Sequence, residues 1–169
     1  MIPFFFLFLF TSTIQAAENI HIKADIFELD AKKNQVVASG NVVVNQNDMT
    51  LYGRMAQFDQ DRQWVHLFGP VTLRQGEMVL TSKEIKAYSQ ENRVDAMGNV
   101  QFRFGDIHGT ADKTSYERMR QRVQLEGRPK AWQGTDEISG QSISIDLKRG
   151  KIITKGDAKV ILNLDKIKK

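Results

Sequence analysis

A glycine returns every 29 residues along this chain, and this period constrains the fold more than any other feature of the sequence. The five glycines are Gly40, Gly69, Gly98, Gly127 and Gly156. Because glycine makes up about 7% of an average protein, four successive intervals of equal length would rarely arise by chance. A fixed period of this size is typical of repeat proteins, in which each unit stacks on the next.

Apolar residues stand two and four positions before and after most of these glycines. An apolar residue at every second position is the period of a β-strand with one buried face. A glycine within such a strand favours a bend or a close approach of two backbones. The four columns, in chain order, hold Val36, Val65, Val94, Val123 and Ile152; Ala38, Leu67, Ala96, Leu125 and Thr154; Val42, Val71, Val100, Pro129 and Ala158; and Val44, Leu73, Phe102, Ala131 and Val160.

The other half of each unit repeats on the same period. It has a column of small residues, then an apolar column, then a mostly polar column that opens a turn. These columns hold Ala24, Gly53, Ser82, Ala111 and Gly140; Leu29, Phe58, Ala87, Tyr116 and Ile145; and Asp30, Asp59, Tyr88, Glu117 and Asp146. Between the first two columns the apolar phase slips by one residue, as a β-bulge or a sheet corner requires. Two bends and two turns per unit predict roughly three short strands per repeat and about fifteen in all.

No part of the mature chain shows helical periodicity, so the sequence predicts an all-β protein. Because each strand has one apolar face, the units must fold over so that these faces meet across an interior. We expect a twisted, open β-jellyroll or solenoid-like stack of antiparallel strands. The two ends of such a stack are unpaired edges, which recruit further strands, so we expect protomers to join head to tail. The candidate edge residues are Ile20, Ile22, Val160, Leu162 and Leu164.

The first 17 residues carry no Asp, Glu, Lys or Arg, and they include an apolar run at residues 2–10. This run, followed by a polar stretch that ends in Ala16 and Ala17, is typical of a cleaved secretory signal. A retained membrane anchor is the alternative, although a spanning helix needs about 20 apolar residues. Export without any cysteine fits a bacterial periplasm. The sequence therefore predicts a signal peptide at residues 1–17, one domain at residues 18–164 and a basic tail at residues 165–169.

The chain lacks the residues that most catalytic and metal sites use. It has no Cys, and its three histidines (His21, His66 and His108) lie in different repeats. The motifs of phosphate loops, serine hydrolases and zinc proteases are absent. A polysaccharide-lyase type of enzyme would need a charged column, and no column is uniformly acidic or basic. We therefore expect no enzyme activity, no metal ion and no cofactor.

Charge and aromatic residues leave two questions open. Basic turns at residues 118–122 and 148–151 and the basic tail are either a solvated face or a contact for anionic lipid headgroups. Export argues against nucleic acid as a partner. Trp64, Phe68 and Trp132 stand in the outward phase of their strands, where they either pack at an edge or form an interaction surface.

Several segments resemble the OstA-like domain family, whose type member is LptA. Residues 20–25 (IHIKAD) and residues 37–44 (VASGNVVV) resemble the start of that domain. Residues 94–100 (VDAMGNV), 125–127 (LEG) and 151–156 (KIITKG) are similar to its later repeats. Each short motif is weakly specific, but the resemblance extends over residues 19–164 in register.

This resemblance implies a periplasmic lipopolysaccharide-binding protein that shields lipid A acyl chains in its apolar interior and bridges the inner and outer membranes. The implied partners are lipopolysaccharide, LptC-like and LptD-like proteins, and further copies of the chain. An LptC-like membrane-anchored relative and a purely structural β-repeat protein are the alternatives. The interior positions, which are the candidate lipid-binding residues, are Ile22, Val36, Ala38, Val42, Val44, Leu51, Val65, Leu67, Val94, Val100, Phe102, Val123 and Leu125.

Overall fold

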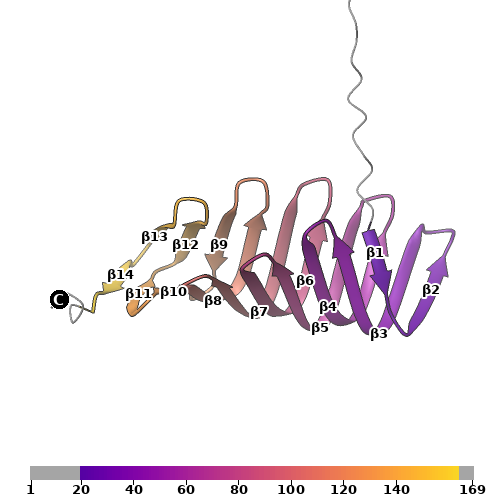
Figure 1. Cartoon of the computed structure of the whole chain (residues 1–169), viewed down its shortest axis with the longest axis horizontal. Helices are drawn as coiled ribbons and strands as arrows, with labels where there is room; N and C mark the ends of the chain where they lie inside the picture. The colour runs from indigo at the N-terminus through magenta and orange to yellow at the C-terminus, as the bar shows by residue number, and fades with distance from the viewer. Residues whose placement is uncertain (1–19, 164–169) are drawn as a thin grey trace, which may run out of the picture.

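The computed structural model describes residues 20–163, and all regular structure within them is β. The strands pair antiparallel in one open sheet, which confirms the predicted all-β class (Figure 1). The predicted signal peptide, the basic tail and Leu164 lie outside the described residues. The strands are β1 (Ile20–Lys23), β2 (Ile26–Asp30), β3 (Gln35–Gln46), β4 (Met49–Asp59), β5 (Trp64–Gln75), β6 (Met78–Tyr88), β7 (Arg93–Phe104), β8 (Ile107–Glu117), β9 (Arg122–Glu126), β10 (Lys130–Gln133), β11 (Asp136–Ser139), β12 (Ser142–Asp146), β13 (Lys151–Lys155) and β14 (Lys159–Ile161).

The six central strands, β3 to β8, have 11 or 12 residues each and bend near the middle. A shift of the pairing register marks each bend, as between Ser39 and Val42 on β3. Towards the chain ends the same bend divides one long strand into two, which gives the pairs β1/β2, β9/β10, β11/β12 and β13/β14. The described residues form 14 strands, close to the predicted fifteen. In the central repeats, however, two long bent strands take the place of the expected three short ones.

The bends form one line across the sheet, and both small-residue columns lie on it. The five repeating glycines all adopt positive φ angles, which L side chains rarely adopt. At Gly127 (φ 74°) the carbonyl accepts a 2.9 Å hydrogen bond from the backbone N–H of Asp112. A Cβ added to Gly127 would lie 2.6 Å from the Cβ of Asp112. The 29-residue period therefore marks the positions at which the chain bends and lies in close contact with the backbone of a neighbouring strand.

Replacing Gly127 with alanine tests this explanation. The positive φ angle costs about 1–3 kcal/mol for a non-glycine residue, and the contact with Asp112 adds to that cost. We expect urea denaturation to show a loss of about 2–4 kcal/mol in the free energy of unfolding. Gly76→Ala is the matched control, because Gly76 has a φ of 54° but nothing within 4 Å of the added Cβ. Equal losses in both variants would mean that the close contact at the bend has no energetic role.

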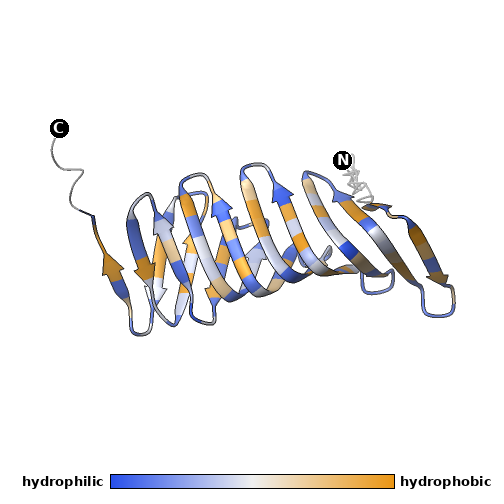
Figure 2. Cartoon of the chain, turned by 90° about the horizontal axis from the view of Figure 1, so that it is seen from below, coloured by the Kyte–Doolittle hydropathy of each residue, from blue (hydrophilic) through white to orange (hydrophobic). Residues whose placement is uncertain are grey.

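The line of bends divides the sheet into two halves that face each other. Half-sheet A consists of β2, β9, β12, β13 and residues 35–39, 55–59, 64–68, 84–88, 93–97 and 113–117. Half-sheet B consists of β1, β10, β11, β14 and the remaining parts of β3 to β8. Hydrophobic and hydrophilic residues alternate along the strands (Figure 2). The apolar faces of the two halves form a single buried cluster, which is the predicted interior.

The chain reverses along two rims opposite the line of bends. Four-residue turns join the strands of half-sheet A, and two-residue turns join those of half-sheet B. In the turns after Asp30, Asp59 and Asp146, the carboxylate accepts the backbone N–H of the residue three positions later. These aspartates open turns, as the sequence predicts. The rims border the interior on its long side.

Candidate functional site

The interior between the half-sheets contains the predicted lipid-binding residues. Ile22 packs against the cluster while partly buried, and Val36 is partly buried. The alternation that placed all thirteen positions on one face is thus correct, whereas lipid contact stays a prediction. The other eleven are fully buried members of the cluster: Ala38, Val42, Val44, Leu51, Val65, Leu67, Val94, Val100, Phe102, Val123 and Leu125.

The thirteen candidates leave out part of this interior, although the apolar columns of the sequence already include Leu73 and Ile145. Further buried side chains extend the cluster towards both rims and towards the C-terminal repeat. The same two-residue alternation continues through these positions, so the signal was present in the sequence. These residues are Met49, Leu73, Met78, Leu80, Ile85, Ile107, Ile143 and Ile145.

The side chains of the protein itself fill the interior. A Cβ added to Gly53 on half-sheet B would lie 3.1 Å from Leu67 Cδ2 on half-sheet A. At Gly109 the corresponding distance to Leu125 Cδ1 is 2.9 Å. Both contacts lie beside the line of bends, and near the rim of half-sheet B the side chains of Met49 and Met78 are also buried (1% and 2% exposed). A lipid chain can enter only if the two half-sheets move apart.

A polar contact joins the two rims at one point on the long side of the interior. Arg118 follows β8 on the rim of half-sheet A, and its Nη2 donates a 3.4 Å hydrogen bond to Asp48 Oδ1 on the rim of half-sheet B. Gln75 Nε2 donates to the same carboxylate at 2.9 Å. The Arg118 side chain is 11% exposed and that of Asp48 is 65% exposed. Arg118 Nε and Gln75 Oε1 are buried without a hydrogen-bond partner.

Tyr116 lies beneath this contact, on the inward face of half-sheet A. Burial raises the pKa of its phenol, and the charges of Arg118 and Asp48 act on it with opposite signs. The rim contact therefore holds the largely buried cation of Arg118 directly above the apolar interior. Such a cation is desolvated at a cost that a single long ion pair with an exposed carboxylate offsets only in part.

The two ends of the stack are open and apolar. Phe27 (45% exposed) and Leu29 (72%) on β2 pair with Ala38 and Val36 and so lie in the inward phase. Val160 (54%) and Leu162 (61%) are exposed at the other end. Val160 pairs with Ile138, which packs against the buried cluster, so Val160 also lies in the inward phase. The apolar interior therefore continues to both ends of the stack.

The predicted edge residues are placed at these ends, but they are only part of the edges. Ile20 and Ile22 lie on β1, which pairs with β3 alone, and Val160 lies on β14, which pairs with β11 alone. Leu162 follows β14. Sequence reasoning missed β2 and β13, which are the matching edges of half-sheet A. Each end thus has two edge strands, one from each half-sheet.

Comparison with known proteins decides the family. The family described as "LptA/(LptD N-terminal domain) LPS transport protein" matches residues 21–63 and 53–151. The chain belongs to this family. It is an LptA-like lipopolysaccharide transport protein, as the repeats of residues 19–164 indicate. Among curated proteins, none matches the chain.

A solved structure of an LptA-like protein is also similar. It is LptH from Pseudomonas aeruginosa, the LptA-homologous periplasmic component of the lipopolysaccharide transport device. The two sequences are 20% identical, the TM-score is 0.41, and the match covers 86% of this chain and 96% of LptH.

The outward aromatic residues of this LptA-like chain pack against neighbouring side chains. Trp64 is buried beneath Lys86, whose Nζ lies 4.1 Å from the ring centroid. Phe68 stacks on His66 with the ring centroids 3.9 Å apart. On half-sheet B, Trp132 Nε1 donates to Glu137, whose pKa is lowered by hydrogen bonds from Lys130 and then from Trp132. Local packing therefore explains their outward position. The packing is not at an edge of the sheet, because β5 and β10 each pair with a strand on both sides.

The described residues also bear on the sequence predictions about metal binding and the basic turns. Residues 20–163 contain no group of three potential metal ligands and no helix that could cross a membrane. In the basic turns, Arg120 and Arg149 are largely exposed and pair with Glu117 and Asp146 of the same turns. The absence of catalysis stays a prediction. The family itself is a transport family.

Proposed function

We propose that this chain is a periplasmic carrier that holds the acyl chains of lipopolysaccharide between half-sheets A and B. The observation that carries the proposal is the apolar interior, which runs the length of the stack and is open at both ends. Membership of the LptA family supports lipopolysaccharide as the cargo.

The energetics of the interior suit reversible binding. Burial of an acyl chain stabilises a complex by about 0.8 kcal/mol per CH₂ group. Parting the half-sheets exposes the apolar side chains that now touch each other, and this cost opposes binding. The lipid then covers the same side chains, so much of the cost is recovered. The polar sugar and phosphate groups would stay at the rims, next to Arg118 and Asp48.

The open ends suit a chain of carriers that bridges the two membranes. Further copies of this chain, an LptC-like protein at the inner membrane and an LptD-like protein at the outer membrane are the partners that would fit these ends. Strand addition at the four edge strands would satisfy unpaired backbone groups and make the interior continuous across each junction. The two ends differ in sequence, so the assembly would be heterologous and open.

Photo-crosslinking tests the position of the lipid. A photoreactive residue at Phe102 or Leu67, both buried in the interior, should capture lipopolysaccharide. The same residue at Gln101, in the outward phase of β7, should capture none. Equal capture at the inward and outward positions would contradict lipid binding between the half-sheets.

Two other functions predict different results. A purely structural β-repeat protein also fits the filled interior, and it would capture no lipid at any position. An LptC-like anchored protein would keep its first 17 residues and stay in the membrane fraction. The intact mass of the exported protein separates that alternative from the periplasmic carrier.

A further inference from the structure

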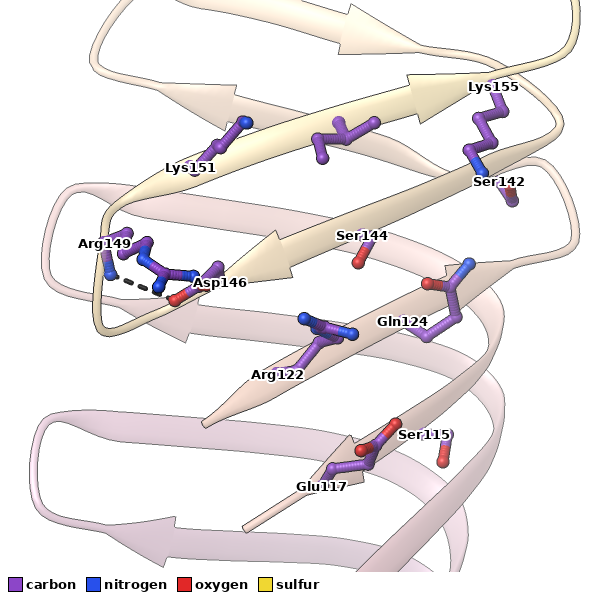
Figure 3. A pocket seen from close by; sticks show the side chains of 11 residues that line it. Ser115, Glu117, Arg122, Gln124, Ser142, Ser144, Asp146, Arg149, Lys151 and Lys155 are labelled. Atoms are coloured by element: carbon purple, nitrogen blue, oxygen red, sulfur yellow. Dashed lines mark hydrogen bonds and ion pairs between the residues drawn. The ribbon is translucent and has the colours of Figure 1, made fainter. Parts of the chain in front are cut away.

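A hollow of about 690 Å³ lies on the outer face of half-sheet A, away from the apolar interior. It extends over β8, β9, β12 and β13, and Ser144 lies at its centre (Figure 3). The residues that line it alternate with the buried Val123, Leu125, Ile143 and Ile145, so they point outward. Lipid between the half-sheets would not reach this site.

Rows of paired residues across the four strands give the hollow its shape. Ser115, Gln124 and Ser144 stand side by side in the middle row, which ends at Ile153. Longer charged side chains flank this row. On one side the paired residues are Glu117, Arg122, Asp146 and Lys151, and on the other side Ser142 pairs with Lys155.

The hollow exists because two serines replace longer side chains in the last repeats. Ser115 and Ser144 belong to a column whose earlier members are Glu28, Gln57 and Lys86. In the middle of the molecule, Lys86 covers this column by lying over the ring of Trp64. The outer surface at this column is therefore covered by a long side chain at Lys86 and is open at Ser115 and Ser144.

The free charge of the hollow is positive. Glu117 pairs with Arg120 at 2.8 Å, and Asp146 pairs with Arg149 at 3.2 Å. The backbone N–H of Arg149 is the main cause of a lowered pKa of Asp146, so this carboxylate stays ionised. The positive charge of Arg122 also contributes to the lowered pKa of Asp146, but Arg122 forms no direct ion pair with it. Among residues 20–163, Lys151 and Lys155 form no direct ion pair either. Three cations without a direct ion pair thus surround a floor of hydroxyl and amide groups.

We propose that this hollow binds an anionic saccharide. The unpaired cations would bind its phosphate or carboxylate groups, and the serines, Gln124 and the two carboxylates would exchange hydrogen bonds with its hydroxyl groups. A ligand that presents phosphates alone would gain nothing from the carboxylates. Ile153 is half exposed and gives the C–H face of a sugar an apolar contact.

A second, smaller hollow continues the site along the sheet. It holds about 210 Å³ and shares Ser115 and Gln124 with the first. Its charged lining residues are Lys113, Asp95 and Glu126, so this part of the site would contact the hydroxyl groups of a sugar and not its anionic groups. The two hollows together leave room for a saccharide that extends beyond one sugar unit. The lipopolysaccharide being carried and the bacterial cell wall are two sources of such saccharides.

Calorimetric titration of the full chain tests the proposal and separates these sources. One probe is lipid-free, phosphorylated core oligosaccharide from lipopolysaccharide, and the other is a disaccharide muropeptide, whose charge is a carboxylate. We expect binding of at least one probe and much weaker binding of neutral maltohexaose. Because neither probe has acyl chains, the result does not depend on lipid binding in the interior.

Matched variants show whether the hollow is the site. Arg122→Gln with Lys151→Gln should weaken binding about tenfold or more. Ser144→Gln should do the same without any change of charge, because it restores the longer side chain of the earlier repeats. Lys32→Gln with Lys148→Gln removes two turn lysines outside the hollow and should leave binding close to that of the wild type.

Three results would overturn the proposal. They are no binding of either anionic saccharide, a control pair that weakens binding as much as Arg122→Gln with Lys151→Gln does, and a Ser144→Gln protein that binds as well as the wild type. Far-UV circular dichroism and thermal melting check that each variant is folded. If Ser144→Gln does not fold, Ser115→Gln fills the same floor from β8 and takes its place. Weakening by the control pair would show that the cations attract saccharides only through net charge.

Discussion

Replacing Phe27 and Leu29 together with aspartate is expected to abolish end-to-end association of this protein. Both side chains lie in the inward phase of β2 and are 45% and 72% exposed, so they contribute little to the fold of a single protomer. At a junction they would be buried against the β13 and β14 end of the next protomer. Burying two such side chains is worth about 1.5–3 kcal/mol each, so association should weaken roughly a hundredfold or more.

Sedimentation over a concentration series measures this effect. The wild-type protein should form a ladder of oligomers, and the double variant should stay monomeric. Met119→Asp is the control, because Met119 is an exposed apolar residue in a turn away from both ends. Truncation after Asp157 removes β14 at the opposite end and should have the same effect as the double variant. A monomeric wild type, or a double variant that associates normally, would contradict assembly through these edges.

The sequence predicts the local features of this fold because they depend on neighbours along the chain. Alternation around Gly98 places Val94, Val100 and Phe102 on one face, and all three are buried. The phase slip beside Gly53 predicts a bend, and the register shifts there. Both signals arise within a few residues, where strand geometry alone relates position to direction.

How these bends align across the sheet could not be predicted from the sequence. The glycine column and the small-residue column were read as two separate bends, and they are one line across the sheet. Only the pairing of β3 with β4 and its equivalents shows this, because Gly53 pairs with Val42, directly after the register shift that contains Gly40. Counting each bend as the end of a strand then produced three short strands per repeat in place of two long ones.

The rim contact and the outer hollow were missed for different reasons. Arg118 and Asp48 are 70 residues apart, which is not a multiple of the repeat, so no column relates them. Their contact depends on how far the two half-sheets are offset. The hollow did have a signal, namely the change from Glu28, Gln57 and Lys86 to Ser115 and Ser144 within one column. Reading columns for side-chain size as well as polarity would have found it.

Replacing Arg118 with methionine is expected to stabilise the protein and to weaken its binding of lipopolysaccharide. The Arg118 side chain is 11% exposed, its Nε is buried without a hydrogen-bond partner, and its ion pair is a 3.4 Å contact with an exposed carboxylate. Methionine keeps the apolar stem without the desolvated charge. Removal of a poorly paired buried cation should raise the free energy of unfolding by about 1–3 kcal/mol.

The same change makes the closed interior harder to open. If lipid enters between the half-sheets, the rims at Arg118 and Asp48 must part, and water or a lipid phosphate then solvates the arginine. Methionine gains nothing from opening, so lipid binding should weaken by about the same free energy, which is roughly tenfold or more. Urea denaturation and titration with lipopolysaccharide measure the two effects.

Arg120→Met is the matched control for this pair of effects. Arg120 belongs to the same turn, is largely exposed and pairs with the exposed Glu117. Exposed ion pairs contribute little to stability, so neither the free energy of unfolding nor lipid binding should change appreciably. A less stable Arg118→Met protein with unchanged lipid binding would show that the arginine holds the rims together. Higher stability together with weaker lipid binding is expected only if the charge of Arg118 disfavours the closed interior. In that case the group that lowers the stability of the closed protein is also the group that favours its opening to lipid.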